Sequence, residues 1–112
     1  MFPKLSPEAG LAALAAAGDD YVVPFRHGTL EVGVYLPAKV DAQTPHTRDE
    51  IYVVARGEGW FVHGEQQHRF AAQDVLFAAA GVVHRFEGFS EDFLVWVFFY
   101  GPEGGERDEQ GS

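Results

Sequence analysis

The sequence predicts a single all-β domain, a sandwich or barrel of short strands, with one short helix at its N-terminus. The chain has 112 residues, enough for one hydrophobic core and fewer than usually divide into separate domains. Its 10 phenylalanines and 13 glycines favour strands and tight turns over helix bundles. From residue 21 onward, strand-like segments follow one another closely with turn signals between them, a spacing typical of all-β sandwiches and barrels.

The first twenty residues predict a short helix packed on the outside of the β domain. Ser6 is a good N-cap residue, and the proline after it has the backbone angle that the first helical position requires. Leucines then recur at helical spacing until Gly18, a residue typical of helix ends. We therefore expect a helix from Pro7 to Ala17, within an N-terminal segment of residues 1–20.

Residues 21–102 are expected to form the β domain. The stretch 38–49 is polar and contains a proline, so it is predicted to be a loop with a short strand around Gln43 to His46. Beyond Pro102 the sequence is charged and rich in glycine, and residues 103–112 are predicted to be a disordered acidic tail. The expected strands are residues 21–26, 29–36, 50–56, 60–63, 67–70, 75–78, a strand carrying His84 and Phe86, and residues 93–100.

The last expected strand, FLVWVFFY, is apolar on both of its faces. Successive residues of a strand point to opposite sides, and a sheet with one wet face should alternate apolar and polar residues. The outer face of this strand must therefore be covered, either by the N-terminal helix or by a second subunit. We expect a homodimer.

The charge and composition narrow the classes of partner. A formal net charge of -9 repels nucleic acid and anionic membranes, and no basic patch offsets it. The chain has no cysteine, which removes disulfides and thiolate metal sites and fits a cytoplasmic location. No apolar run approaches the roughly 20 residues needed to cross a bilayer. A small molecule is the expected partner.

Two metal-ligand residues, His46 and Glu50, open the stretch before the third strand. On one straight strand they would lie about 13 Å apart, too far to share a metal. A helix would stack them on one face, and a turn at residues 47–49 would also bring them together. The β-branched and aromatic run that follows favours a strand, so we prefer the turn. In that turn Arg48 and Asp49 are expected to be solvated.

These residues resemble the cupin family. The resemblance covers about residues 21–100 and is carried by HTRDEIYVVARGEG followed by VLFAAAGVVHRF. Matches to the two cupin motifs are His46, Glu50 and Gly57 in the first and Gly81 and His84 in the second, while Thr44 stands at the position of the first motif's other histidine. Further motif positions are changed to Ala38, Gln73, Ala79 and Gly88.

The resemblance implies a small jelly-roll β-barrel with a metal site inside it, held by His46, Glu50 and His84. Two imidazoles and one carboxylate suit Fe(II) with open positions, and Mn, Zn, Ni or Co also accept such donors. Thr44 makes this a three-ligand site and is expected in the pocket. Tyr52, in phase with Glu50, is the candidate catalytic residue, and Phe86, in phase with His84, is expected as an apolar pocket wall.

Three functions remain open from the sequence. The first is a metal-dependent enzyme of dioxygenase-like or isomerase-like type acting on a small molecule. The second is a non-catalytic cupin that binds or senses a small ligand, because the fold alone does not determine the function. The third is an organic-ligand pocket without metal. His63 and His68 are expected to be exposed strand residues outside the site.

Overall fold

The computed structural model describes residues 4–38, 41 and 44–107. The helix expected at the N-terminus is present, and eight strands follow it. The elements are α1 (Pro7–Ala17), β1 (Tyr21–His27), β2 (Leu30–Tyr35), β3 (Asp49–Arg56), β4 (Glu58–His63), β5 (Gln66–Ala71), β6 (Val75–Ala78), β7 (His84–Glu87) and β8 (Leu94–Tyr100). No helix in this described part of the chain is long and apolar enough to span a membrane.

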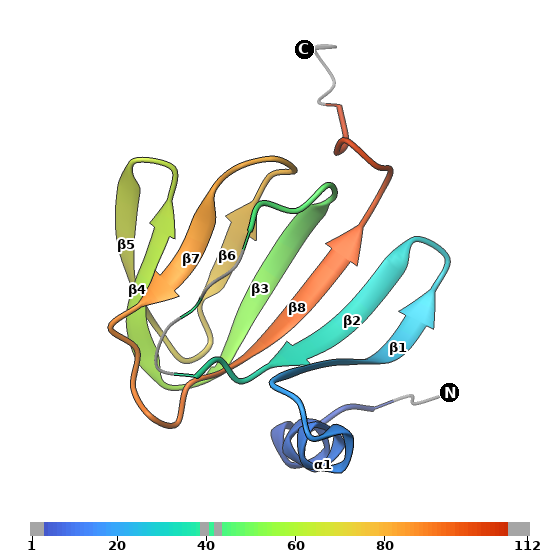
Figure 1. The fold of residues 1–112 in the computed structure, drawn as a ribbon, viewed down its shortest axis with the longest axis vertical. Helices are drawn as coiled ribbons and strands as arrows, with labels where there is room; N and C mark the ends of the chain where they lie inside the picture. The colour runs from blue at the N-terminus through green and yellow to red at the C-terminus, as the bar shows by residue number, and fades with distance from the viewer. Residues whose placement is uncertain (1–3, 39–40, 42–43, 108–112) are drawn as a thin grey trace.

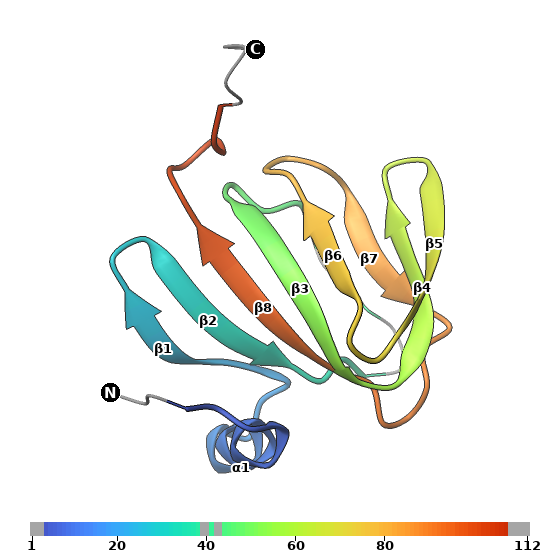
Figure 2. The same cartoon turned by 180° about the vertical axis from the view of Figure 1, so that it is seen from behind.

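The strands form two antiparallel sheets that face each other (Figures 1 and 2). The larger sheet has the order β1-β2-β8-β3-β6, and the smaller has the order β5-β4-β7. The expected jelly-roll arrangement is confirmed, although no strand pair hydrogen-bonds one described sheet to the other to close a barrel. Pro24 lies in β1, an edge strand, where a missing backbone donor costs no ladder hydrogen bond.

An aromatic core fills the space between the sheets. Tyr52 and Val97 of the larger sheet pack in one buried cluster with Phe61 and Phe86 of the smaller sheet. The rings of Tyr52 and Phe86 meet edge to face, with centroids 4.9 Å apart. Because every second residue of these strands points inward, the same faces also carry Glu50 and His84 into the interior.

The helix α1 covers part of the outer face of β8. Ser6 accepts a hydrogen bond from the Ala9 N–H at 3.1 Å, and the helix ends at Gly18, which has a left-handed φ of 64°. Leu14 is buried with Leu94 in a second apolar cluster, and Trp96 packs against it. One of the two covers considered for the last strand is therefore α1, at the lower end of the sheet in Figure 1.

The segment before β3 is held more firmly than the sequence predicted. Arg48 and Asp49 were expected to be solvated, and this expectation is wrong. The Arg48 guanidinium pairs with Glu31 at 2.7 Å and donates to the Gly101 carbonyl at 3.0 Å. Asp49 is buried, and its carboxylate accepts the Ala80 N–H at 2.9 Å. These contacts attach the start of β3 to three other parts of the chain.

The C-terminal segment also differs from its prediction as a disordered tail. The Gly104 N–H donates to the Thr47 carbonyl at 2.6 Å, and the Glu106 N–H donates to the Asp49 carboxylate at 2.7 Å. Residues 103–107 thus lie against the loop that precedes β3. Residues 108–112 lie outside the described part of the chain.

Candidate metal site

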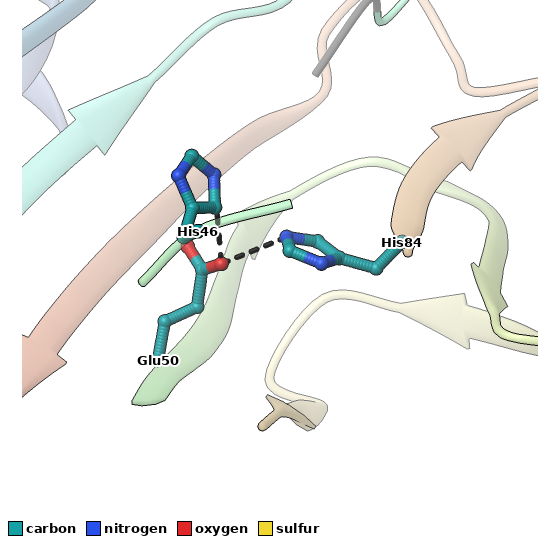
Figure 3. Close-up of side chains that lie close together, drawn as sticks. All are labelled: His46, Glu50 and His84. Carbon is teal, nitrogen blue, oxygen red and sulfur yellow. Dashed lines mark ion pairs between the residues drawn. The ribbon is translucent and has the colours of Figure 1, made fainter. Parts of the chain in front are cut away.

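Three segments bring His46, Glu50 and His84 together at one end of the two sheets (Figure 3). His46 precedes β3, Glu50 is the second residue of β3, and His84 begins β7 in the other sheet. Each residue offers one ligand atom, and these atoms all lie within 4.8 Å of one another. A bend at Thr47 and Arg48 separates His46 from β3, which agrees with the expected turn and excludes the helix. Residues 44–46 form no strand, and Gln43 lies outside the described residues.

The Glu50 side chain is the centre of this cluster. It is 1% exposed, and its Oε1 lies 2.7 Å from His84 Nε2 and 3.7 Å from His46 Nε2. Despite the short distance to His84, the geometry is not that of a hydrogen bond, and Oε1 has no hydrogen-bond partner among the described residues. A buried carboxylate oxygen without a partner is costly, so its environment calls for a cation or a proton.

The Val82 carbonyl fixes the orientation of the His84 ring. Its Nδ1 lies 2.8 Å from the Val82 carbonyl, so Nδ1–H is the donor there and the lone pair of the neutral ring sits on Nε2. That lone pair faces the Glu50 carboxylate, and two acceptors 2.7 Å apart repel each other. The Tyr52 hydroxyl lies 3.0 Å from the same Nε2, within hydrogen-bond distance. A metal ion bound by both groups would remove the repulsion.

A proton is the alternative to the metal. Burial by itself lowers the pKa of His84, but the neighbouring Glu50, the Val82 carbonyl and the charge of Asp41 raise it. The net effect is a pKa above the ordinary histidine value. Protons and metal ions therefore compete for the same pair of atoms.

His46 forms the open side of the cluster. Its side chain is 33% exposed, and its ring packs against Phe99 with centroids 5.1 Å apart. The Gly81 N–H donates to the His46 carbonyl at 2.7 Å, which ties the loop before β3 to the loop before β7. This hydrogen bond holds two segments that are distant in the sequence next to each other at the site.

The donor set fits a divalent metal ion. Two ligand atoms in adjacent coordination positions, each about 2.1 Å from a metal, lie about 3 Å apart. The distances of 2.7 and 3.7 Å from Glu50 Oε1 to the two imidazole nitrogens are close to this separation. The unpartnered carboxylate oxygen supports the same conclusion. The arrangement is able to hold a metal ion, and its donors do not select one metal.

A cavity of about 150 Å³ adjoins the cluster along the inner face of the larger sheet. Its wall is mainly aromatic, and His46 and Glu50 lie at one end. The lining residues are Tyr21, Tyr35, His46, Glu50, Tyr52, Val97 and Phe99. The cluster thus has an adjoining space in which a small molecule can reach the ligand atoms.

Residues 36–100, more than half of the chain, match the AraC-like ligand binding domain family. The chain belongs to this family of cupins. An uncharacterized protein of Streptomyces coelicolor is 36% identical over 96 residues, which cover 83% of this chain and 91% of that protein.

Solved cupin structures share the fold at low sequence identity. A cupin superfamily protein from Desulfitobacterium hafniense aligns with a TM-score of 0.60 at 15% identity, covering 73% of this chain and 76% of its own. KdgF from a Halomonas species aligns with a TM-score of 0.61 at 17% identity, covering 73% of this chain and 80% of its own. At these identities the likeness concerns the fold.

The cupin structure distributes the predicted pocket residues over three places. Tyr52 lines the cavity, as predicted. Phe86 is 1% exposed and packs behind Tyr52, and it does not belong to the lining set. Thr44 is exposed and does not line the cavity either. The cluster that could hold a metal ion is therefore His46, Glu50 and His84, and Thr44 is not part of it.

Four cavity residues and one histidine were missed by the sequence reasoning; the cavity residues are Tyr21, Tyr35, Val97 and Phe99. Tyr21 and Tyr35 face each other across β1 and β2, but a bulge between Val22 and Phe25 shifts this register. Counting residues back from the turn would pair Tyr21 with the wrong partner. Phe99 needed only the inward alternation of β8. His63 was expected to be exposed, yet its Nε2 is buried and has no hydrogen-bond partner in the described part of the chain.

Proposed function

We propose that this cupin holds a divalent metal ion with His46, Glu50 and His84 and binds a small molecule in the adjoining cavity. The observation that carries the proposal is the buried Glu50 Oε1, which has no hydrogen-bond partner among the residues that the structure describes and lies near both imidazoles. The two-histidine, one-carboxylate donor set favours Fe(II), and Mn, Zn, Ni or Co are the other metals to test. A metal in this site supplies Lewis acidity and open positions for a substrate oxygen or dioxygen.

We propose further that the chemistry is dioxygenase-like or isomerase-like. The residues of the chain support such a reaction by binding and by proton handling. The Val82 carbonyl fixes the His84 ring, so that Nε2 is directed toward the site. Tyr52 lines the cavity and has its hydroxyl 3.0 Å from His84 Nε2. This places an O–H donor where it can orient a substrate oxygen or move a proton to it.

A second candidate function is ligand binding without catalysis. The matched family is described as a ligand binding domain, and this observation favours a binding or sensing role for the cavity. In that case the small molecule is retained unchanged. Turnover of a bound compound is the property that separates the two candidates.

Metal analysis of untagged protein tests the proposal. After anaerobic reconstitution with Fe(II), Mn, Zn, Ni or Co and removal of free metal, we expect one metal per chain in wild type and almost none in His84→Ala. The matched control is His68→Ala, because His68 is exposed and bonds only to Gln66 among the described side chains. Less than about 0.1 metal per wild-type chain for every metal contradicts the proposal. Oxygen uptake and product analysis then separate catalysis from binding.

We also propose that the protein is a homodimer. The helix α1 covers only part of the outer face of the larger sheet. On β6 at its edge, Val75 is 66% and Phe77 is 49% exposed. Phe77 lies opposite Ile51 of β3, so the apolar surface continues onto the next strand. A second copy of the chain would remove this surface from water.

A further inference from the structure

We infer that the cavity beside the His46–Glu50–His84 cluster binds one small flat ring, an aromatic molecule that turns oxygen donors to the metal and has an uncharged far end. This inference rests on the proposed function for the metal end of the ligand. Recognition of the ring rests on the cavity itself.

The floor of the cavity is shaped by neighbouring residues of three strands. Val97 of β8 lies between Gly33 of β2 and Tyr52 of β3 in a continuous row. Tyr21 lies over Gly33, and a Cβ atom at Gly33 would be only 2.6 Å from Tyr21 Cε1 and from its hydroxyl. The glycine therefore allows the Tyr21 ring to lie close to the sheet. A side chain at this position would force the ring to move.

The wall of the cavity is mainly aromatic. Tyr21 and Tyr35 meet edge to face, with centroids 6.2 Å apart and planes at 80°. Tyr52 and Phe99 complete the aromatic lining toward the metal cluster. Aromatic rings prefer such edge-to-face or offset contacts with another ring. A flat apolar ligand gains contact with all of these walls.

The cavity offers few polar groups that could pair with a polar ligand. Among the seven lining residues, Tyr35 donates its hydroxyl to Asp41 at 2.8 Å, and the Tyr52 hydroxyl lies at the metal end of the cavity, 3.0 Å from His84 Nε2. A sugar would bury several hydroxyls for which few partners remain, and an unpaired buried hydroxyl is costly. The ligand is therefore expected to carry its polar atoms at the metal end.

The described lining of the cavity carries no cationic side chain that would pair with an anionic ligand. None of the seven lining residues is a lysine or arginine. Burial, followed by the charges of Glu31 and Glu50, raises the pKa of Tyr21 to about 12. The same surroundings disfavour a carboxylate or phosphate at the far end of a ligand.

The volume of the cavity is that of one small ring. The cavity measures about 150 Å³. A dry apolar cavity of about 150 Å³ is known to accept benzene. The volume of the cavity thus matches one six-membered ring.

The test uses the protein loaded with Zn²⁺, which is redox-inactive, after its metal content has been measured. Two metal-binding probes are compared by calorimetry: catechol, which has a ring, and acetohydroxamate, which has none. We expect Gly33→Ala to weaken catechol at least tenfold and to change acetohydroxamate less than twofold, with the zinc content unchanged. Tyr21→Ala is the second variant in case Gly33→Ala does not fold, and Tyr100→Ala, outside the cavity lining, is the control.

Two more ligands test the far end of the cavity. We expect 4-methylcatechol to bind at least tenfold more tightly than 3,4-dihydroxybenzoate, which places a carboxylate at the same position. Equal binding of these two compounds overturns the uncharged far end. Equal losses of catechol and acetohydroxamate in the folded cavity variants, or no loss of either, overturn recognition of the ring while the metal proposal stands.

Failure of the metal proposal leaves the inference testable. If wild-type protein binds no zinc, the probe becomes phenol with the metal-free protein. Binding of phenol that Gly33→Ala or Tyr21→Ala weakens at least tenfold supports the ring cavity. Absence of phenol binding, or binding that is equal in these variants, overturns it.

Discussion

Replacing Glu50 with glutamine should change the stability of the metal-free protein in opposite directions at low and high pH. Below the ordinary histidine pKa of about 6.5, His84 is protonated and its ion pair with Glu50 is complete. Glu50→Gln removes that ion pair and should destabilise the protein. Because the pKa of folded His84 is raised, the stability that the ion pair contributes is lost as the pH rises through that folded pKa.

At a pH above the raised pKa of folded His84, the neutral His84 Nε2 and the Glu50 carboxylate are two acceptors in contact. A glutamine amide in place of this carboxylate is able to donate to Nε2. An unsatisfied buried acceptor costs about 1–3 kcal/mol. We therefore expect Glu50→Gln to raise the free energy of unfolding by about 1–2 kcal/mol at this pH, which corresponds to about 3–8 °C in Tm for a domain of this size.

Calorimetry with EDTA, at about pH 6 and then at a series of higher pH values that carries His84 through its folded pKa, measures both effects. With a saturating metal the comparison should reverse again, because wild type gains about 2.7 kcal/mol at a metal concentration of 100 times Kd and the variant does not. Gln66→Glu, at an exposed position of β5, serves as a charge control. Destabilisation by Glu50→Gln at all of these pH values in EDTA would show that the carboxylate is satisfied without metal, and this would refute the reasoning.

Three further predictions concern positioning, pH and assembly. Asp49→Ala should lower the free energy of unfolding by about 1–3 kcal/mol, because it removes the acceptor of the Ala80 N–H. It should also weaken metal binding about 10–100-fold, because the loop before β7 loses this attachment, and an unchanged metal affinity would contradict this role. The free energy of unfolding should fall as the pH rises above about 10 toward about 12, because burial raises the pKa of Tyr21 to about 12 and also raises that of Tyr35, while unfolded tyrosines ionise near 10. Tyrosine absorbance and urea unfolding measure this, and ionisation of all four tyrosines near pH 10 without unfolding would exclude it. Phe77→Lys should convert a dimer to a monomer in light scattering, and a monomeric wild type would refute the proposed interface.

Local signals were sufficient for most of the fold. Ser6, Pro7 and Gly18 delimit a helix whose observed bounds are those expected, because capping depends on neighbouring residues alone. Strand positions followed from alternation and turn residues, with differences of a few residues at their ends. The resemblance to the two cupin motifs implied that His46, Glu50 and His84 meet.

Contacts between distant segments could not be read in this way. Asp49 was taken for a solvated turn residue, but it accepts backbone N–H groups from residues 80 and 106. Asp41 bridges the sheets by accepting from Tyr35 and from the Phe86 N–H, and nothing in its polar loop sequence indicated this. Such bonds depend on where other segments end after the chain has folded.

The sequence by itself determined the class of fold, the positions of the elements and the identity of three candidate ligands, because periodicity, capping and motif spacing are local properties of the chain. Only the tertiary structure decided that Glu50 Oε1 is buried without a hydrogen-bond partner among the described residues, that Thr44 does not line the cavity, and that Tyr21 lies over Gly33. Each of these facts depends on the register and approach of two sheets. A bulge of one residue in β1 is enough to change which side chains meet in the cavity.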